Sequence, residues 1–519
     1  MPPPRTDLAA ILSRTLGCEA FLVGGAVRDS LMGRFSPDLD IILPEKKKGF
    51  VRSRAAEAAK ALEGGCFTLD EETLVYRISV RNPFPFQVDI SAFQGPDLES
   101  DLRRRDFTAN ALAYPLTDKC ATENAKCGKP GAKKLKISNS KSGLKITGLE
   151  ASRTTDPCRG REDIRRGIIR IAGPEAFRED PLRTLRAFRC AAELGWELSS
   201  GTLAAVKAAV PLLRGTAPER IHDELLHLLA ADNSACWLKK MDGTGLLTAV
   251  FPELEPQRKC AEVYYGRDGV LKHSIRVVDR VDYLFANAAK IFSRLHGRLL
   301  PFLREKSNLK LAALLHDLGK PPMAKKVKDR LRFFGHEEKG AEMAGAIMQR
   351  LRFSRSEIRF VSRLTLHHLR PGNLAANNYI SDKAVYRFFR DLGEDGIPLL
   401  LLCWADHTSY LSIAELRSIE KEIQKPPFPI PSKGLPAQGP VKTLRYLQVV
   451  NLMLSLYLDR SPAIVQERLV DGRDIMNIMK IPPGPDVGKV LEKIRDAQAD
   501  GKICCRRQAL DYLRKLARP

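Results

Sequence analysis

Three features are scarce in this sequence of 519 residues: long apolar runs, paired cysteines and acidic side chains. No apolar stretch approaches the roughly 20 residues that a membrane-spanning helix needs, and the first ten residues contain no apolar signal-peptide core. The 11 cysteines include no Cys-x-x-Cys pair, which favours reduced thiols over a disulfide framework. We therefore expect a cytoplasmic protein without a membrane segment.

The shortage of acidic residues leaves a strongly basic chain. Lysine and arginine number 85 against 62 aspartates and glutamates, so the formal net charge is +23. Such an excess favours a polyanionic partner, with nucleic acid ahead of a membrane surface, although a generally basic proteome would produce the same excess. The length is too great for one hydrophobic core and predicts several domains.

The stretch 21–43, FLVGGAVRDSLMGRFSPDLDIIL, has the most informative pattern. It predicts a short strand, a turn at Gly24 and Gly25, a helix, and a second strand that begins with Asp38 and Asp40. Residues two apart in a strand share a face, so these carboxylates lie side by side and need a compensating cation. Mg²⁺ bound between them and a nucleoside triphosphate meets that need, with the glycine turn offering N–H groups to a phosphate. Solvated carboxylates at a strand edge fit the same pattern.

The residues that follow predict a small mixed sheet with helices. A helix is expected over 52–65, and strand-like runs follow at 66–70, 74–80 and 86–93. The last run contains Asp89, which can supply a third carboxylate if its strand lies beside Asp38 and Asp40.

An arginine-rich stretch, DLRRRDFTANALAY, comes next. The guanidinium groups of 103–105 suit triphosphate oxygens because they are planar, multidentate donors. Asp106 and Asn110 carry groups that suit sugar hydroxyls. A solvated helix face has the same composition.

Taken together, GGAVRDSLMGR…DLD and RRDFTANALAY resemble the family of tRNA nucleotidyltransferases and bacterial poly(A) polymerases, in the eubacterial class of the polymerase-beta superfamily. The resemblance implies that Asp38 and Asp40 bind the catalytic Mg²⁺. It also implies a nucleotide pocket formed by Gly24, Gly25, Arg28, Asp29, Arg105, Asp106 and Asn110.

A later segment, EAFREDPLRTLRAFR, places arginines at helical spacing. Arg183, Arg186 and Arg189 are predicted to share a helix face with Asp180, where they present donors and acceptors like a base edge. An internal ladder of ion pairs is the alternative. The segment resembles the family's E-D-x-x-R motif, which implies that Asp180 and Arg183 select the incoming base with Arg186 and Arg189 in support.

The histidines are concentrated in one region. Seven of the nine lie between His273 and His407, which predicts a divalent metal site built from several helices. The order of motifs, including HDLGKP, resembles the HD phosphohydrolase superfamily. That resemblance implies a divalent metal bound by His273, His316, Asp317 and Asp406, with His336 and His367 as candidates for a second metal. An HD module that serves only as an RNA-binding scaffold is the alternative.

We therefore predict an α+β protein. A nucleotidyltransferase head (1–173) with a small mixed sheet carries a flexible basic insertion at about 117–155. An all-α neck (174–257), an all-α HD domain (258–414), and a Pro-rich linker with a helical RNA-binding tail (415–519) follow. In the tail, a resemblance to the family pattern covers Gly472, Asp474, Gly484, Pro485 and Gly488.

The predicted activity is template-independent addition of CMP, AMP or both to the 3′ end of tRNA, from CTP and ATP, by two-metal catalysis. The HD domain adds a potential phosphohydrolase activity. Two alternatives remain open at this point: a poly(A) polymerase that adds AMP to RNA 3′ ends, and an HD-type phosphohydrolase as the main activity.

Overall fold

The computed structural model describes residues 7–17, 19–81, 84–116, 135–436, 439–459 and 468–517. The chain divides into two compact units, Met1–Ala217 with Gly243–Ala249, and Pro218–Asp242 with Val250–Pro519. Among the described helices, none combines the length and apolar character needed to cross a membrane.

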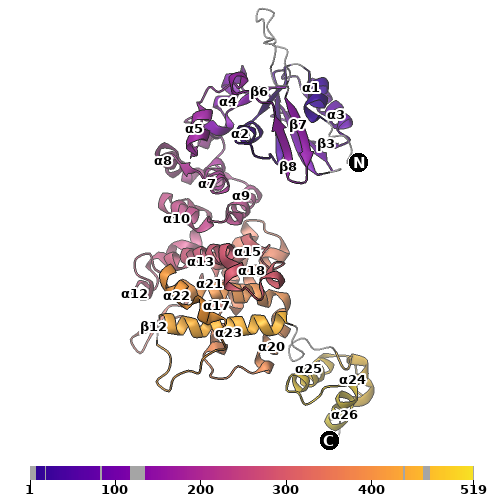
Figure 1. Ribbon diagram of the computed structural model, residues 1–519, viewed down its shortest axis with the longest axis vertical. Coiled ribbons are helices and arrows are strands. Elements are labelled where there is room, and N and C mark those ends of the chain that lie inside the picture. Colours follow the sequence, from indigo (N-terminus) through magenta and orange to yellow (C-terminus); the bar gives the residue numbers. More distant parts are fainter. Residues whose placement is uncertain are drawn as a thin grey trace, which may run out of the picture. The chain divides into compact units, whose positions relative to one another are not determined.

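A mixed sheet forms the centre of the first unit (Figure 1). It has six strands in the order β3-β4-β5-β2-β1-β6. β2 and β5 pair in parallel, whereas the other neighbouring strands are antiparallel. Buried and less buried residues alternate along β4 and β5, as expected for strands with one covered face. The predicted small mixed sheet is confirmed. Its strands are β1 (Phe21–Val23), β2 (Asp38–Leu43), β3 (Gly65–Asp70), β4 (Val75–Val80), β5 (Phe86–Ala92) and β6 (Ala113–Pro115).

Helices cover this sheet through one apolar core. Leu12 of α1 and Val51 of α3 pack with Leu22 and Ile90 of the strands, and all four are fully buried. The Asp7 carboxylate accepts a hydrogen bond from the Ala9 N–H and so caps α1. The helices here are α1 (Leu8–Leu16), α2 (Gly25–Leu31), α3 (Lys48–Ala61), α4 (Leu98–Arg103) and α5 (Gly160–Arg166).

The predicted flexible insertion at 117–155 needs correction for the part that the structure describes. β7 (Lys136–Ser140) and β8 (Gly143–Thr147) form an antiparallel hairpin. Ile137, Leu144 and Ile146 alternate with polar residues, and they are buried in the same core as the sheet. This alternation outweighs the basic, polar composition on which the prediction of a loop rested. Residues 117–134 lie outside the described residues.

The first unit continues with helices that follow the head. α7 buries Leu185 and Phe188, while the arginines of the predicted base-reading segment occupy other positions of the helix. The elements are β9 (Ile168–Ile169), which pairs in parallel with β10 (Glu197–Leu198), and α6 (Ala176–Glu179), α7 (Arg183–Leu194), α8 (Ser200–Ala209) and α11 (Leu246–Val250).

The second unit is almost entirely helical. α21 is buried along almost its whole length and lies in the centre of the core of this unit. The second unit contains α9 (Pro218–Ala230), α10 (Ser234–Thr244), α12 (Glu262–Tyr265), α13 (Gly269–Ile291), α14 (His296–Leu299), α15 (Lys306–Leu315), α16 (Lys320–Met323), β11 (Lys325–Val327), β12 (Arg330–Arg332), α17 (His336–Arg350), α18 (Arg355–His367), α19 (Arg370–Ala375), α20 (Asp382–Leu392), α21 (Gly396–Thr408), α22 (Ile413–Ile423) and α23 (Pro440–Leu458).

α23 packs against α19, α21 and α22, so the Pro-rich stretch connects two helices of one body. The tail that follows has a small core of its own, formed by α24 (Gly472–Met479), α25 (Pro485–Ala499) and α26 (Arg506–Leu516). An ion pair of 2.8 Å between Lys383 and Asp500 joins α20 to this tail.

The β7–β8 hairpin gives a direct test of the fold. We expect Leu144→Ala to lower the free energy of unfolding of the first unit by about 2–5 kcal/mol, because it leaves a cavity in the shared core. Lys141→Ala, at the exposed turn of the same hairpin, is the control and should change stability by less than about 0.5 kcal/mol. Chemical denaturation of both variants measures the difference, and equal stabilities would contradict the packing of this hairpin.

Candidate active sites

Three carboxylates lie on one face of the head sheet. Asp38 and Asp40 are two apart at the start of β2, and Asp89 of β5 is the direct parallel partner of Asp40. Residues opposite one another on adjacent strands project to the same side of the sheet, so the structure places the three predicted residues on one face.

The chain leaves part of this negative charge uncompensated. Burial raises the pKa of Asp40 to about 6, and the neighbouring charges of Asp38 and Asp89 add to the rise. The Arg105 guanidinium opposes it without cancelling it. Mg²⁺ takes oxygen ligands and commonly binds through one or two carboxylates together with substrate phosphates. The donor set at Asp38 and Asp40 fits this ion.

Sequence reasoning missed the partner of Asp89. Arg77 on the neighbouring strand β4 lies opposite Asp89 and donates two hydrogen bonds to its carboxylate, of 2.8 and 2.7 Å. Such a bidentate pair fixes the direction of the Asp89 carboxylate. The one sequence feature that could have indicated this pair is Arg77 itself, a single charged residue within the alternating strand VYRISV.

The glycine turn serves chiefly to let two side chains approach the backbone. A Cβ atom at Gly24 would lie 2.8 Å from Oδ2 of Asp40 and 3.3 Å from Nη1 of Arg105, and the residue has a φ of +73°. The Gly24 N–H donates to the Leu112 carbonyl at 3.3 Å, so it is not the phosphate donor expected from the sequence. Gly25 begins α2, whose first-turn N–H groups have no acceptor within the helix.

A continuous network links Arg28, Asp29, Asp106 and Asn110, whereas the predicted Arg105 lies 3.6 Å from Asp101. Arg28 donates to Asp29 at 2.9 Å and to the Asn110 side-chain oxygen at 2.7 Å. Asn110 donates to Asp106 at 3.1 Å, and Arg186 of α7 lies 3.6 Å from the same aspartate. Burial alone would raise the pKa of Asp106, but Arg186 and Asn110 hold it below its usual range.

The base-reading residues are arranged differently from the prediction. Asp180 has an extended backbone and precedes α7, so it does not share a helix face with Arg183. Its carboxylate accepts a hydrogen bond of 3.2 Å from the Leu182 N–H. Arg183 donates to the carbonyls of Arg104 and Ala176, at 2.9 and 3.1 Å, which holds its guanidinium in one place. Arg189 lies farther along α7, 3.8 Å from Glu193.

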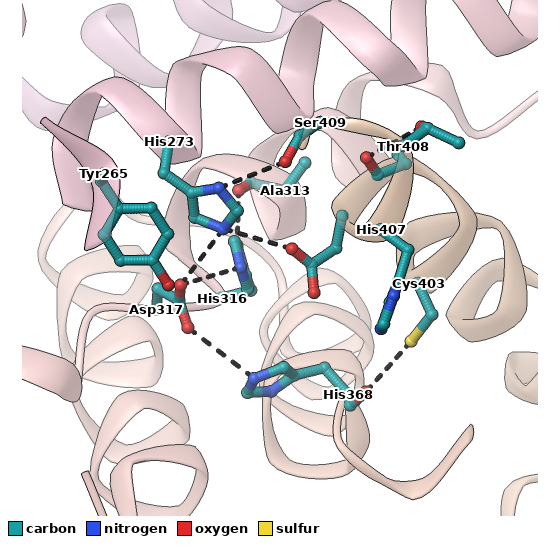
Figure 2. A network of polar contacts seen from close by, with 12 residues as sticks. Tyr265, His273, Ala313, His316, Asp317, His368, Cys403, His407, Thr408 and Ser409 are labelled. Carbon is teal, nitrogen blue, oxygen red and sulfur yellow. Dashed lines mark hydrogen bonds and ion pairs between the residues drawn. The ribbon is translucent and has the colours of Figure 1, made fainter. Parts of the chain in front are cut away.

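A second cluster lies in the second unit, where α13, α17, α21 and the ends of α15 and α18 meet. Figure 2 shows part of it, with His273, His316, Asp317 and His368 turned toward one another. Two groups of three side chains each have ligand atoms within 4.8 Å of one another, and the described residues contain no other such groups. They are His273, His316 and Asp406, and Asp317, His336 and His368. The predicted residues of the HD motif, with His336, are thus brought together.

The imidazole rings are oriented by hydrogen bonds at their outer nitrogens. Nδ1 of His316, His336 and His368 lies 2.9, 2.7 and 2.6 Å from the carbonyl oxygens of Ala313, Phe333 and Thr365. A ring that donates from Nδ1 to a carbonyl presents the lone pair of Nε2 on its other side.

Several buried, inward-facing atoms form no well-aligned hydrogen bond, and their near polar contacts are with one another, as in the 3.2 Å between Nε2 of His273 and Oδ1 of Asp406. They are Nε2 of His273 and His316, and one carboxylate oxygen each of Asp317 and Asp406. Buried polar atoms normally have a partner, and imidazole nitrogens with carboxylate oxygens suit a divalent transition metal. The donor set therefore fits a divalent metal.

His368 contacts this cluster, and the prediction of His367 as a metal ligand is corrected accordingly. Nε2 of His368 lies 3.2 Å from Nε2 of His336 and 3.8 Å from Asp317. Consecutive residues of a helix differ by about 100° in direction, so only one of the two histidines at the end of α18 faces the site. The sequence HH alone does not reveal which one.

A cavity of about 280 Å³ opens beside the cluster, and Asp317, His336, His368 and Asp406 line part of it. Lys320, the lysine of the HDLGKP motif, donates to Asp317 and to the Tyr265 hydroxyl. Burial alone would lower the pKa of Lys320, but Asp317 and Tyr265 raise it above its usual range. A fixed positive charge therefore lies at the cavity wall.

Comparison with known proteins identifies the types of domain in which the two sites lie. The model of the poly A polymerase head domain matches residues 20–129, that of the probable RNA and SrmB-binding site of polymerase A matches 195–258, and that of the HD domain matches 270–411. The chain thus combines a poly A polymerase head, a polymerase-type RNA-binding segment and an HD domain, in the order expected from its resemblance to tRNA nucleotidyltransferases and bacterial poly(A) polymerases. Head domains of this kind and HD domains generally use divalent metals.

Alignments with curated relatives cover nearly the whole chain. An A-adding tRNA nucleotidyltransferase of Deinococcus radiodurans is 28% identical over 96% of this chain and 95% of the relative. A CC-adding tRNA nucleotidyltransferase of Geobacter sulfurreducens is 27% identical over 99% and 95%. The solved Thermotoga maritima CCA-adding enzyme, complexed with tRNA, has the same fold, with a TM-score of 0.56, 19% identity and 99% coverage of both chains.

Adjacent histidines test the metal cluster. We expect His368→Ala to reduce the Mn²⁺ retained by the full chain after loading and desalting by at least about tenfold, since one ligand of a three-residue group is lost. His367→Ala is the matched control and should retain metal like the unaltered chain. Elemental analysis by mass spectrometry measures the Mn²⁺ retained by both variants. Loss of Mn²⁺ from His367→Ala but not from His368→Ala would contradict the assignment of His368 to the cluster.

Proposed function

We propose that this protein adds CMP, AMP or both to the 3′ end of tRNA without a template. The observation that carries the proposal is the face shared by Asp38, Asp40 and Asp89, together with the network that runs from Asp29 of the adjacent helix α2 to Arg186 of α7. Relatives that resemble the chain over nearly its full length carry names of CC-adding and A-adding tRNA enzymes.

In this proposal Asp38 and Asp40 hold Mg²⁺, which when bound supplies charge neutralisation at the triphosphate and acidifies the RNA 3′-hydroxyl. Asp89 provides the third carboxylate on this face, and Arg77 holds it in position. Arg28 and Arg105 bind triphosphate oxygens.

Base choice is assigned to Asp180 and Arg183. Hydrogen bonds with backbone groups hold the Asp180 carboxylate and the Arg183 guanidinium in place. A wrong base therefore leaves polar groups of these two side chains unpaired. The remaining basic surface, including the tail, binds tRNA through its phosphates, which makes affinity depend on salt. Arg186 and Arg189 support the base-reading end.

The decisive experiment is primer extension. Purified protein is incubated with tRNAs that end before the CCA, after C, after CC and after CCA, with labelled CTP or ATP, and product lengths are read. Addition that stops at CC, at A or at CCA supports the proposal and identifies the nucleotides. Long A-tails on any RNA 3′ end, without C addition, would instead identify a poly(A) polymerase.

A single carboxylate provides a mutational test. We expect Asp40→Asn to lower the rate of nucleotide incorporation by at least about 10³-fold, because several kcal/mol of charge stabilisation are lost. The affinity for tRNA should change little. Asp70→Asn, at an exposed position of the same sheet, is the control. Incorporation by Asp40→Asn at a rate near that of the unaltered chain would refute the catalytic assignment.

We also propose that the HD cluster is a metal-dependent phosphohydrolase site. The six clustered ligands and the nearby charge of Lys320 support this second activity. The bound metal would activate water, while Lys320 would attract a phosphate into the cavity.

The two activities should separate by mutation. We expect His316→Ala to remove hydrolysis of phosphate monoesters or diesters and to leave nucleotide addition to tRNA within about twofold of the unaltered chain. His367→Ala should spare both activities. Assays of both reactions on the same preparations provide the measurement, and loss of nucleotide addition in His316→Ala would show that the division is wrong.

A further inference from the structure

A surface groove continues outward from the HD cavity. It has a volume of about 840 Å³ and shares Tyr264, Tyr265, His336, Leu369 and Lys442 with the cavity of about 280 Å³. Single ligand pockets commonly measure about 300–1,000 Å³, so the cavity suits one nucleotide-sized group and the groove leaves room for more of a chain. We call this surface the hairpin groove, because the β11–β12 hairpin and the segment after it form one wall.

The hairpin is a defined element. β11 and β12 pair in antiparallel register, and Lys328 and Asp329 of the two-residue turn both have positive φ, as a type I′ turn requires. The Tyr264 hydroxyl donates to the Leu331 carbonyl at 3.2 Å and ties the hairpin to α12. The wall of the groove is thus held in place without a ligand.

The chemistry of the wall is basic and aromatic. Two basic residues of the hairpin, Arg330 and Arg332, line the groove, and Lys442 and Glu337 line it as well. Next to it, Phe334 is 71% exposed and Tyr264 is 42% exposed. Exposed aromatic rings beside cations bind single-stranded nucleic acid by stacking on bases while the cations contact phosphates. Lysine is depleted in protein–protein interfaces, which argues against a protein partner.

We propose that the hairpin groove binds single-stranded RNA and directs its phosphorylated end into the HD cavity. Arg330 and Arg332 contact the backbone, Phe334 stacks on a base, and Lys320 and Lys442 face the terminal phosphate at the inner end. This inference rests on the second activity proposed above and names its substrate as an RNA strand rather than a free nucleotide.

Binding is measured by fluorescence anisotropy on the full chain in EDTA, so that no metal-dependent reaction occurs. The probes are labelled RNA hexamers phosphorylated at the 3′ end or at the 5′ end, which distinguishes the two possible termini. We expect Phe334→Ala to weaken binding of one probe at least about fivefold, the factor for about 1 kcal/mol of lost stacking. The double variant Arg330→Ala/Arg332→Ala should reduce the slope of log K against log salt by about 1.4.

Matched controls lie elsewhere on the same unit. Tyr379→Ala removes an aromatic ring that is 79% exposed, and Lys421→Ala removes an exposed charge, both outside the groove. Neither should change affinity by more than about twofold. A hexamer with 4-thiouridine at the phosphorylated end should crosslink to peptides containing 320–336 or 442. Unchanged affinity in the groove variants, or crosslinks confined to 1–217 or 468–517, would overturn the inference.

The outcome is separable from that of the proposed function. Phe334→Ala should add nucleotides to tRNA at the normal rate. If the unaltered chain hydrolyses a small phosphate ester while groove variants bind RNA normally, the groove inference fails and the hydrolase proposal stands. If the groove binds RNA but no phosphate ester is hydrolysed, the hydrolase proposal fails and the groove remains an RNA-binding site.

Discussion

Buried negative charge is the constraint on which both sites depend. A carboxylate removed from water requires a positive partner, and the chain supplies some partners and leaves other charges uncompensated. Asp89 has Arg77, and Asp317 has Lys320, each at hydrogen-bond distance. Among the described residues Asp40 has no such hydrogen-bonded cation, and burial, together with the charges of Asp38 and Asp89, raises its pKa. The chain thus fixes one carboxylate of each site with a cation of its own and leaves Asp40 without one.

Local patterns made much of this predictable. The period of a strand placed Asp38 and Asp40 on one face, and the clustering of histidines along the chain indicated a site built from several helices. Both inferences need only the geometry of a single element or the density of one residue type. The mixed sheet followed in the same way from alternating runs, as β4 and β5 show.

Features that depend on pairing between distant elements could not be read in advance. Arg77 meets Asp89 only because β4 and β5 are neighbours in a particular register, and no local pattern specifies register. The choice between His367 and His368 depends on the rotation of α18 against its neighbours. The β7–β8 hairpin was obscured by its basic, polar composition, although its few apolar residues alternate correctly for a strand.

Two glycines explain why the motifs combine reactive side chains with small residues. A Cβ at Gly24 would nearly touch the Asp40 carboxylate, and a Cβ at Gly319 would lie 2.0 Å from the His336 carbonyl. The first glycine lets the α2 turn approach β2, the strand that carries Asp38 and Asp40. The second lets the end of α15 approach the start of α17, which brings Asp317 within 3.6 Å of the His336 ring. In each motif the charged residue supplies the chemistry and the glycine supplies the space. A larger side chain at either position would separate the ligands while leaving every one of them in the sequence.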